Sequence, residues 1–220
     1  NIQFNLLPVL LCFSILLANK KSYHIQEFDN FIYNSLNTSK IAGMGIAILS
    51  KDSVLYKKGY GYSDLKGKKR FTTNTIMNIA SISKTFIGTS IMYLVENKQI
   101  NLDDDINTLL PFHIYNPHSP ESIITLRALM SHTSGIIDNQ EIYLSSYHYG
   151  KDSPIKLGYF LKNYLSKDGE FYSEDNFTNK TIGKEFTYSN IGAGLAGYIV
   201  EIISGKPFNI FTKDIIFGPL

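Results

Sequence analysis

The strongest constraint on this chain is the stretch from Asn78 to Phe86, where an apolar run meets an amphipathic pattern. The residues before this joint form a short strand-like run of Ile76, Met77 and Ile79. The apolar residues after it recur at helical spacing: Phe86, Ile87, Ile91, Leu94 and Val95. Serines at the joint favour a helix N-terminus. The sequence therefore predicts a strand that leads into a helix, with Ser81 at the start of the helix and Lys84 one turn on.

Ser81 and Lys84 are spaced so that one can act on the other. Residues three apart share a helix face, with Cβ atoms about 5–6 Å apart. A serine hydroxyl needs a neighbouring base to become an effective nucleophile, and a desolvated lysine can be that base. Such a lysine needs a pKa of roughly 7–8 instead of about 10.4. The pair is a candidate nucleophile and base, and a capped core helix is the alternative that these residues alone leave open.

The Ser-x-x-Lys pattern occurs three times, and its context separates the three cases. Ser63 and Lys66 lie in a basic turn, whereas the pair of Ser153 and Lys156 encloses a proline and is typical of a polar helix start. Only Ser81 and Lys84 join a strand-like run to an amphipathic helix. The helix N-terminus carries about half a unit of positive charge, which favours negative charge developing at Ser81.

Composition sets broad limits on the chain. Its 220 residues are enough for one domain or two small ones, and a hydrophobic content of 44% suffices for a packed core. The formal net charge of +2 gives no reason to expect a nucleic acid or an acidic surface as a partner.

The first residues resemble a targeting segment more than part of a fold. Residues 4–18 are almost continuously apolar and are followed by Asn19-Lys20-Lys21. A run of about 15 residues is short for a membrane-spanning helix, which needs about 20. We expect a signal peptide within residues 1–20 and a secreted or extracytoplasmic domain over residues 21–220. The alternatives are a retained membrane anchor or a buried helix. The one cysteine, Cys12, lies in this segment, so the mature domain would have no disulfide.

Periodicity and turn residues predict the main elements of the domain. Helical patterns cover residues 25–36, 126–130, 155–165 and 191–204, the last ending at Gly205. A buried strand is expected over residues 43–49 and a second strand over residues 54–56. The Gly59-Tyr60-Gly61 stretch favours close backbone packing over a nucleotide site.

The sequence gives no support for a metal or a cofactor. The acids Asp103, Asp104 and Asp105 lack the glycine and terminal glutamate of a calcium loop, so we interpret them as a solvated helix start. The five histidines show no i, i+4 pair of the kind that binds zinc. For His132 we favour a turn or a supporting position near a site over catalysis.

A second chemical element lies at Tyr188-Ser189-Asn190, the one Tyr-x-Asn in the sequence. A tyrosine near Ser81 and Lys84 could move protons, and an asparagine could bind a substrate amide or hold the lysine. An ordinary helix cap is the alternative.

Several stretches follow one another in the order and approximate spacing of a known family: Ala80–Phe86, Leu129–Gly135, Tyr188–Asn190, Ser204–Phe208 and Ile216–Leu220. Over residues 25–220 the chain resembles the serine β-lactamase-related superfamily, which includes class C β-lactamases, low-molecular-weight penicillin-binding proteins and related esterases and peptidases. The resemblance implies an α+β, β-lactamase/transpeptidase-like fold. Such a fold has an antiparallel sheet flanked by helices plus a mainly helical domain.

The resemblance also implies roles for four residues. Ser81 would be the acylated nucleophile, Lys84 its base partner and Tyr188 a second proton-transfer group. Asn190 would contact the substrate or Lys84. The backbone N–H of Ser81 would form half of an oxyanion hole.

The family's third motif, Lys-Thr-Gly or His-x-Gly on a sheet strand, is expected downstream of residue 220. His148-Tyr149-Gly150 matches His-x-Gly but precedes Tyr188, which is the wrong chain order. We therefore expect a fragment whose sheet is incomplete and has an unpaired edge.

The expected function is that of a metal-independent serine hydrolase without a cofactor, which acts on a small-molecule or peptide substrate through an ester, amide or peptide bond. Three glycosylation sequons, at Asn37, Asn176 and Asn179, favour an esterase or peptidase over a periplasmic β-lactamase. The alternatives are a non-catalytic binding or scaffold protein on the same fold, and a β-lactamase or D,D-peptidase in the narrow sense.

Overall fold

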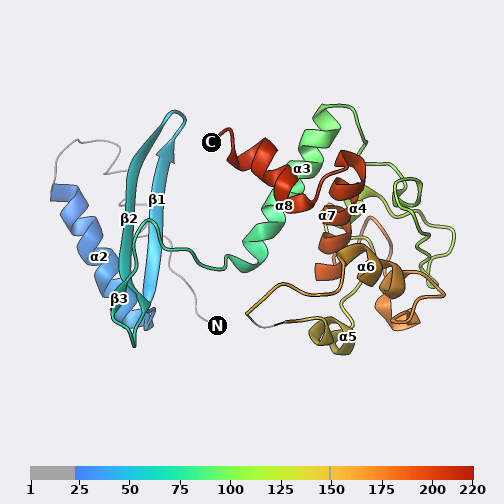
Figure 1. The fold of residues 1–220 in the computed structure, drawn as a ribbon, viewed down its shortest axis with the longest axis horizontal. Helices are drawn as coiled ribbons and strands as arrows, with labels where there is room; N and C mark the ends of the chain where they lie inside the picture. The colour runs from blue at the N-terminus through green and yellow to red at the C-terminus, as the bar shows by residue number, and fades with distance from the viewer. Residues whose placement is uncertain (1–22, 149) are drawn as a thin grey trace. The chain divides into compact units, whose positions relative to one another are not determined.

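The computed structural model describes residues 23–148 and 150–220, which form two compact units that divide between Asn78 and Ile79 (Figure 1). The expected signal segment within residues 1–20, Cys12 included, lies outside the described residues. Among the helices that are described, none is both long and apolar enough to cross a membrane.

The first unit is a helix packed on a small antiparallel sheet. Helix α2 (Tyr23–Ser39) precedes β1 (Gly43–Ser50), β2 (Ser53–Asp64) and the short β3 (Lys69–Arg70), in the sheet order β1-β2-β3. The predicted helix and both predicted strands are confirmed, although β2 is much longer than residues 54–56. The expected burial of the first strand was wrong, because each residue of β1 is at least partly exposed. Among the described residues β1 pairs only with β2, so the sheet is open at that edge, as expected.

The core of this unit lies between α2 and one face of the hairpin (Figure 1). Phe28, Ile32 and Leu36 recur every four residues and are buried against Tyr60 of β2.

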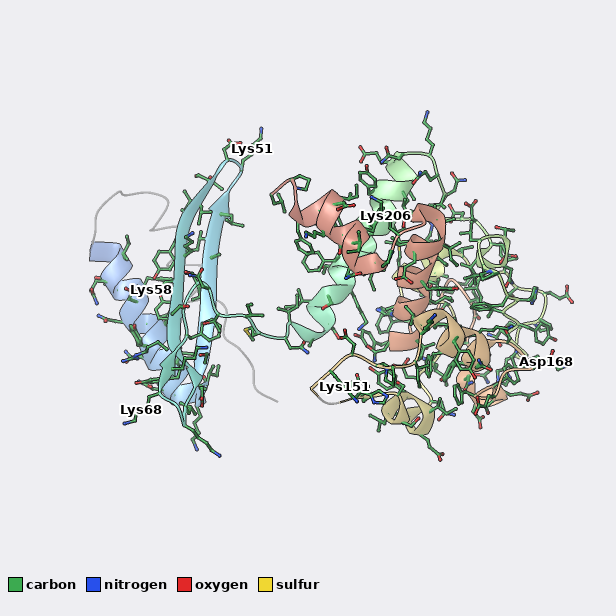
Figure 2. The ribbon with its side chains drawn as sticks, viewed as in Figure 1. Lys51, Lys58, Lys68, Lys151, Asp168 and Lys206 are labelled. Atoms are coloured by element: carbon green, nitrogen blue, oxygen red, sulfur yellow. The ribbon has the colours of Figure 1, made fainter. Side chains whose placement is uncertain are left out.

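A carboxylate is enclosed in the same layer. Asp29 accepts hydrogen bonds from the hydroxyls of Tyr56 and Tyr60, at 2.5 and 2.6 Å. Lys58, labelled in Figure 2, places its Nζ 2.5 Å from the other carboxylate oxygen. Burial raises the pKa of Asp29, but these hydrogen bonds outweigh it and hold the pKa below its ordinary value.

The glycines of β2 allow close backbone packing, as the sequence suggested. A Cβ on Gly59 would lie 2.4 Å from the carbonyl oxygen of Phe71. Gly61 has a φ of 69°, and a Cβ there would lie 2.2 Å from the carbonyl oxygen of Ala42. Neither position tolerates a side chain.

The second unit is mainly helical. Its helices are α3 (Ser83–Glu96), α4 (Leu126–Met130), α5 (Gln140–Ser145), α6 (Leu157–Leu165), α7 (Asn190–Ser204) and α8 (Phe208–Thr212). Short turns of 3-10 helix cover Ala80–Ile82, Ile106–Thr108 and Glu174–Asn176, and a π turn covers Lys213–Phe217. The predicted helices over residues 126–130, 155–165 and 191–204 are confirmed, with Gly205 in the left-handed conformation at the end of α7.

Helix α7 lies at the centre of this unit and packs against α3, α4, α6 and α8 (Figure 1). Small residues let the neighbouring backbones approach: a Cβ on Gly197 would lie 3.6 Å from the side chain of Ile87 on α3. Leu195, Ile199 and Val200 are fully buried in the core of this unit. Because α3 and α7 are held side by side, residues at their N-terminal ends can meet.

The acidic stretch before α4 is a surface turn. Asp105 accepts a hydrogen bond from the backbone N–H of Asn107 and so caps the 3-10 turn Ile106–Thr108. Asp103 forms a two-pronged ion pair with Arg127, at 2.7 and 2.8 Å. The expected solvated helix start is thus a single 3-10 turn with charged residues facing water.

Candidate active site

Ser81 lies in the 3-10 turn Ala80–Ile82, which runs directly into α3. Two local predictions were wrong. Residues 76–79 form no strand, and neither serine caps the helix, because the N-cap position is Ile82. The turn itself uses the backbone donors that a cap would bind: the N–H of Ser83 bonds to the carbonyls of Ala80 and Ser81. The hydroxyl of Ser81 is thereby left for other partners.

The backbone just before Ser81 is strained. Ala80 has a φ of 46°, a left-handed conformation that side chains other than glycine rarely adopt. Such a conformation costs on the order of 1–3 kcal/mol and persists where the surrounding structure enforces it. Strain of this kind gathers at functional sites, so the turn itself marks Ser81 as a residue of interest.

The structure brings the four residues singled out in the sequence together. The Oγ of Ser81 lies 2.8 Å from the hydroxyl of Tyr188 and 3.2 Å from the Nζ of Lys84. That Nζ also donates to the Oδ1 of Asn190 at 2.6 Å. Ser81 and Tyr188 are exposed, whereas Lys84 and Asn190 are half-buried. A serine hydroxyl is therefore held between an amine and a phenol.

Tyr188 and Asn190 are positioned by the N-terminus of α7. Ser189 is the N-cap of this helix, and its Oγ accepts a hydrogen bond of 2.8 Å from the N–H of Gly192. The helix-cap interpretation thus holds for Ser189. It does not compete with the chemical one, because the cap fixes the residues on either side of it.

Asp138 is the residue that the sequence reasoning missed. Its carboxylate accepts four hydrogen bonds: from the Oγ of Ser189 and the backbone N–H groups of Asn190 and Ile191, each at 3.0 Å, and from the Nδ2 of Asn190 at 2.7 Å. The last of these turns the Oδ1 of Asn190 toward Lys84. The one signal in the sequence was an acid directly after the apolar Ile136-Ile137, and nothing local connects it to α7.

His132 supports the segment that carries Tyr188. Its Nδ1 accepts a hydrogen bond from the N–H of Ser189, its carbonyl accepts one from the N–H of Thr187, and its ring lies 4.5 Å from that of Tyr188. Burial and the positive charge of Lys84 lower the pKa of His132, and the charge of Asp138 opposes them only in part. A neutral imidazole in this place fits the turn and supporting position that the sequence favoured.

The electrostatics of the site also act on Tyr188. Hydrogen bonding with Lys84 and Ser81, together with the charge of Lys84, lowers the pKa of Tyr188 below its ordinary value. Burial and the negative charge of Asp138 work in the opposite direction and are outweighed. A phenol that ionises more readily is better suited to giving and taking protons near neutral pH.

The other two Ser-x-x-Lys matches form no such pair. The hydroxyl of Ser63 donates to the carbonyls of Lys69 and Arg70, and that of Ser153 accepts from the N–H of Ile155. Tyr149, in the middle of the His-x-Gly match, lies outside the described residues.

The fold and its site define the class of protein. The fold is of the β-lactamase/transpeptidase type, with a three-stranded antiparallel sheet, a flanking helix and a helical unit. The Beta-lactamase family model matches residues 28–220, and the chain belongs to this family.

Several known proteins are similar to the chain. "Protein flp" of Staphylococcus aureus strain MRSA252 is 29% identical over 195 residues, which are 89% of this chain and 36% of that protein. Two solved structures match closely. The octameric penicillin-binding protein homologue from Pyrococcus abyssi has a TM-score of 0.69 and 27% identity, over 89% of this chain and 42% of its own. The D-amino acid amidase from Ochrobactrum anthropi SV3 has a TM-score of 0.65 and 25% identity, over 86% and 47%. The chain thus spans less than half the length of these relatives.

Proposed function

We propose that the complete protein is a serine hydrolase that forms an acyl-enzyme on Ser81 and acts on an ester, amide or peptide bond. The observation that carries this proposal is the position of the Ser81 hydroxyl, within hydrogen-bond distance of both Lys84 and Tyr188. The hydrolase fold of the family supports it.

In the acylation step, the Oγ of Ser81 forms a bond to the substrate carbonyl carbon, and the amine of Lys84 takes the hydroxyl proton. The carbonyl oxygen becomes an oxyanion, for which the backbone N–H of Ser81 is one donor. The proton then passes through Tyr188 to the leaving oxygen or nitrogen, and the bond from carbon to that atom breaks. Water then attacks the acyl carbon, and the same groups transfer its proton to the Oγ of Ser81 as the acyl group leaves.

Asn190 serves this step by holding Lys84. The 2.6 Å hydrogen bond from Nζ to Oδ1 fixes the amine on the side of Ser81, and Asp138 fixes the amide that accepts it. Holding the base in a reactive geometry lowers the entropic part of the activation free energy.

A second candidate, a β-lactamase or D,D-peptidase in the narrow sense, is supported by the similarity to a penicillin-binding protein homologue. The similarity to a D-amino acid amidase supports small amides instead. A penicillin-type probe separates these candidates. A D,D-peptidase would form a long-lived adduct with it, a β-lactamase would hydrolyse it, and a small-amide hydrolase would do neither.

We also propose that the protein works outside the cytoplasm on a small-molecule or peptide substrate. The apolar residues 4–18, followed by Lys20 and Lys21, support this location. Cell fractionation of the natural host, with an antibody to the protein, tests it.

The experiment that tests the proposed function is mass spectrometry of the complete protein after reaction with a fluorophosphonate probe. We expect one adduct, on Ser81, and none in Ser81→Ala. The matched control is Ser83→Ala, since Ser83 is an exposed serine two residues away that lies outside the hydrogen-bonded group. Undiminished labelling of Ser81→Ala would contradict the assignment, and an unreactive wild-type protein would favour a binding or scaffold function.

A further inference from the structure

A small apolar pocket opens beside Asn190, where α5, α6 and the first turns of α7 meet. Its volume is about 260 Å³. Its walls are mainly hydrophobic: Ile155, Leu157, Phe160, Leu161, Ile191 and Gly194. Tyr143 of α5 and two serines add polar atoms. We name this cavity the α6/α7 pocket.

The pocket adjoins the candidate active site through a shared residue. Asn190 lines the pocket and also accepts the 2.6 Å hydrogen bond from Lys84. Lys84 in turn lies 3.2 Å from the Oγ of Ser81, so two hydrogen bonds connect the nucleophile to a residue that lines the pocket. A group attached next to a carbonyl bound at Ser81 can therefore reach it.

Gly194 is the feature that keeps the pocket open. It lies in the second turn of α7, and a Cβ built there would meet only the Cδ1 of Leu157, at 3.8 Å. That distance is an ordinary van der Waals contact, so nothing in the packing forbids a side chain. A glycine inside a helix costs up to about 1 kcal/mol of stability relative to alanine. Its presence in the wall of the pocket therefore indicates that the space beside it is needed.

The position of Tyr188 indicates which part of a substrate the pocket receives. In the proposed mechanism Tyr188 hands a proton to the leaving group, so the leaving group departs beside its hydroxyl. Tyr188 is not among the residues that line the pocket, whereas Asn190 is. The pocket therefore faces the acyl portion of the substrate.

We propose that the α6/α7 pocket binds an apolar side chain on the acyl group of the substrate, of the size of a phenyl ring or a branched alkyl group. This inference rests on the proposed function and narrows it to a substrate class. An apolar cavity of about 150 Å³ suffices for benzene, so this pocket holds one ring and a linking carbon. A charged acyl side chain would be excluded, because the lining carries no charged residue.

The test compares acyl groups at a constant leaving group in the complete protein. The substrates are p-nitrophenyl acetate, p-nitrophenyl phenylacetate and p-nitrophenyl succinate, and the readout is the ratio of their kcat/KM values. We expect the wild type to prefer phenylacetate over acetate by about 10–200-fold, the range for apolar groups in a matched pocket. Gly194→Val should reduce that ratio at least tenfold, with Gly194→Ala in between.

The matched control is Gly197→Ala. It adds the same methyl group to the same helix, but toward Ile87 of α3 at 3.6 Å and away from the pocket. Its ratio should equal that of the wild type. If Gly194→Val does not fold, Leu157→Ala is the second variant: it enlarges the pocket and should move the preference toward longer acyl chains.

The outcomes separate this inference from the proposed function. If hydrolysis of the acetate ester persists in Ser81→Ala, the proposed function is wrong. If hydrolysis depends on Ser81 but the phenylacetate-to-acetate ratio is unchanged in Gly194→Val, the pocket inference alone is wrong. A wild-type preference for the succinate ester would overturn it as well.

Discussion

Replacing Asp138 by asparagine tests how the site is held together. The carboxylate accepts four hydrogen bonds, two on each oxygen. An asparagine retains one acceptor oxygen and presents an NH₂ group where the other was. That NH₂ would face the two donors of Asn190, or, in the reverse orientation, the N–H of Ile191 and the hydroxyl of Ser189, which can accept as well as donate. In the first orientation, Asn190 can relieve this only by turning its own amide over, which would point its NH₂ at the Nζ of Lys84.

The size of the effect follows from these bonds. A hydrogen bond to a charged group contributes about 1.5–3 kcal/mol, and up to two of the four are lost in Asp138→Asn. Relaxation at the end of a helix recovers part of this, so we expect a loss of about 2–4 kcal/mol in the free energy of unfolding. Loss of a positioned base costs at most about 10²–10⁴-fold in rate, and Lys84 is displaced but not removed. We expect acylation to slow by about 10–100-fold.

The assay is the burst of product release from an activated ester, measured with the complete protein at a temperature where the variant is folded by circular dichroism. The matched control is Asp103→Asn, which removes an exposed carboxylate of the same unit that is paired with Arg127. It should change neither the burst rate nor the free energy of unfolding measurably, because an exposed ion pair contributes little.

A double-mutant cycle shows whether Asp138 acts through Asn190. If it does, Asp138→Asn combined with Asn190→Ala should be little slower than Asn190→Ala alone. A folded Asp138→Asn protein with the wild-type burst rate would refute the reasoning. Independent, multiplicative losses in the double variant would show that Asp138 stabilises the helix end without orienting Asn190.

Two further predictions concern proton transfer and stability. Lys84→Arg and Tyr188→Phe should each slow acylation by about 10²–10⁴-fold; in the first case the reason is that a guanidinium cannot accept a proton. The double variant should be only slightly slower than the slower single variant, because the two groups share one proton path. A burst experiment checks this, and an active Lys84→Arg protein would speak against the base assignment. Asp29 has a lowered pKa in the folded protein, so its contribution to stability is complete above the unfolded pKa of about 3.9 and is lost as pH falls through the lower folded value. Urea unfolding between pH 6 and pH 2 should show a smaller loss in Asp29→Asn than in the wild type, and equal losses would contradict the linkage.

The sequence predicted what depends on local spacing. Ser81 and Lys84 are three residues apart, so any helical turn brings them close. Tyr188 lies 107 residues from Ser81, and its approach depends on the packing of α3 against α7. The role of Tyr188 was predicted from the family's order of motifs, because the periodicity of a single helix says nothing about which other helix packs against it.

The errors arose where tertiary structure replaced local rules. The serines were expected to cap α3, but the 3-10 turn before the helix satisfies the same backbone donors. Ile76 and Met77 are apolar enough for a strand, yet they have no ladder partner among the described residues. Asp138 was missed because its four donors come from a helix start about 50 residues further along the chain.

The hydrogen bonds between Asp138 and the first turn of α7 have a consequence for heat inactivation. Helix ends open at a lower free energy than the cores of helices. The middle of α7 is held by the buried side chains of Leu195, Ile199 and Val200. Its first turn depends instead on hydrogen bonds to Asp138. When that turn frays, the amide that holds Lys84 is released although the rest of the helix remains packed. Under the proposed function, we therefore expect labelling at Ser81 to be lost at a lower temperature than the one at which the hydrophobic core melts.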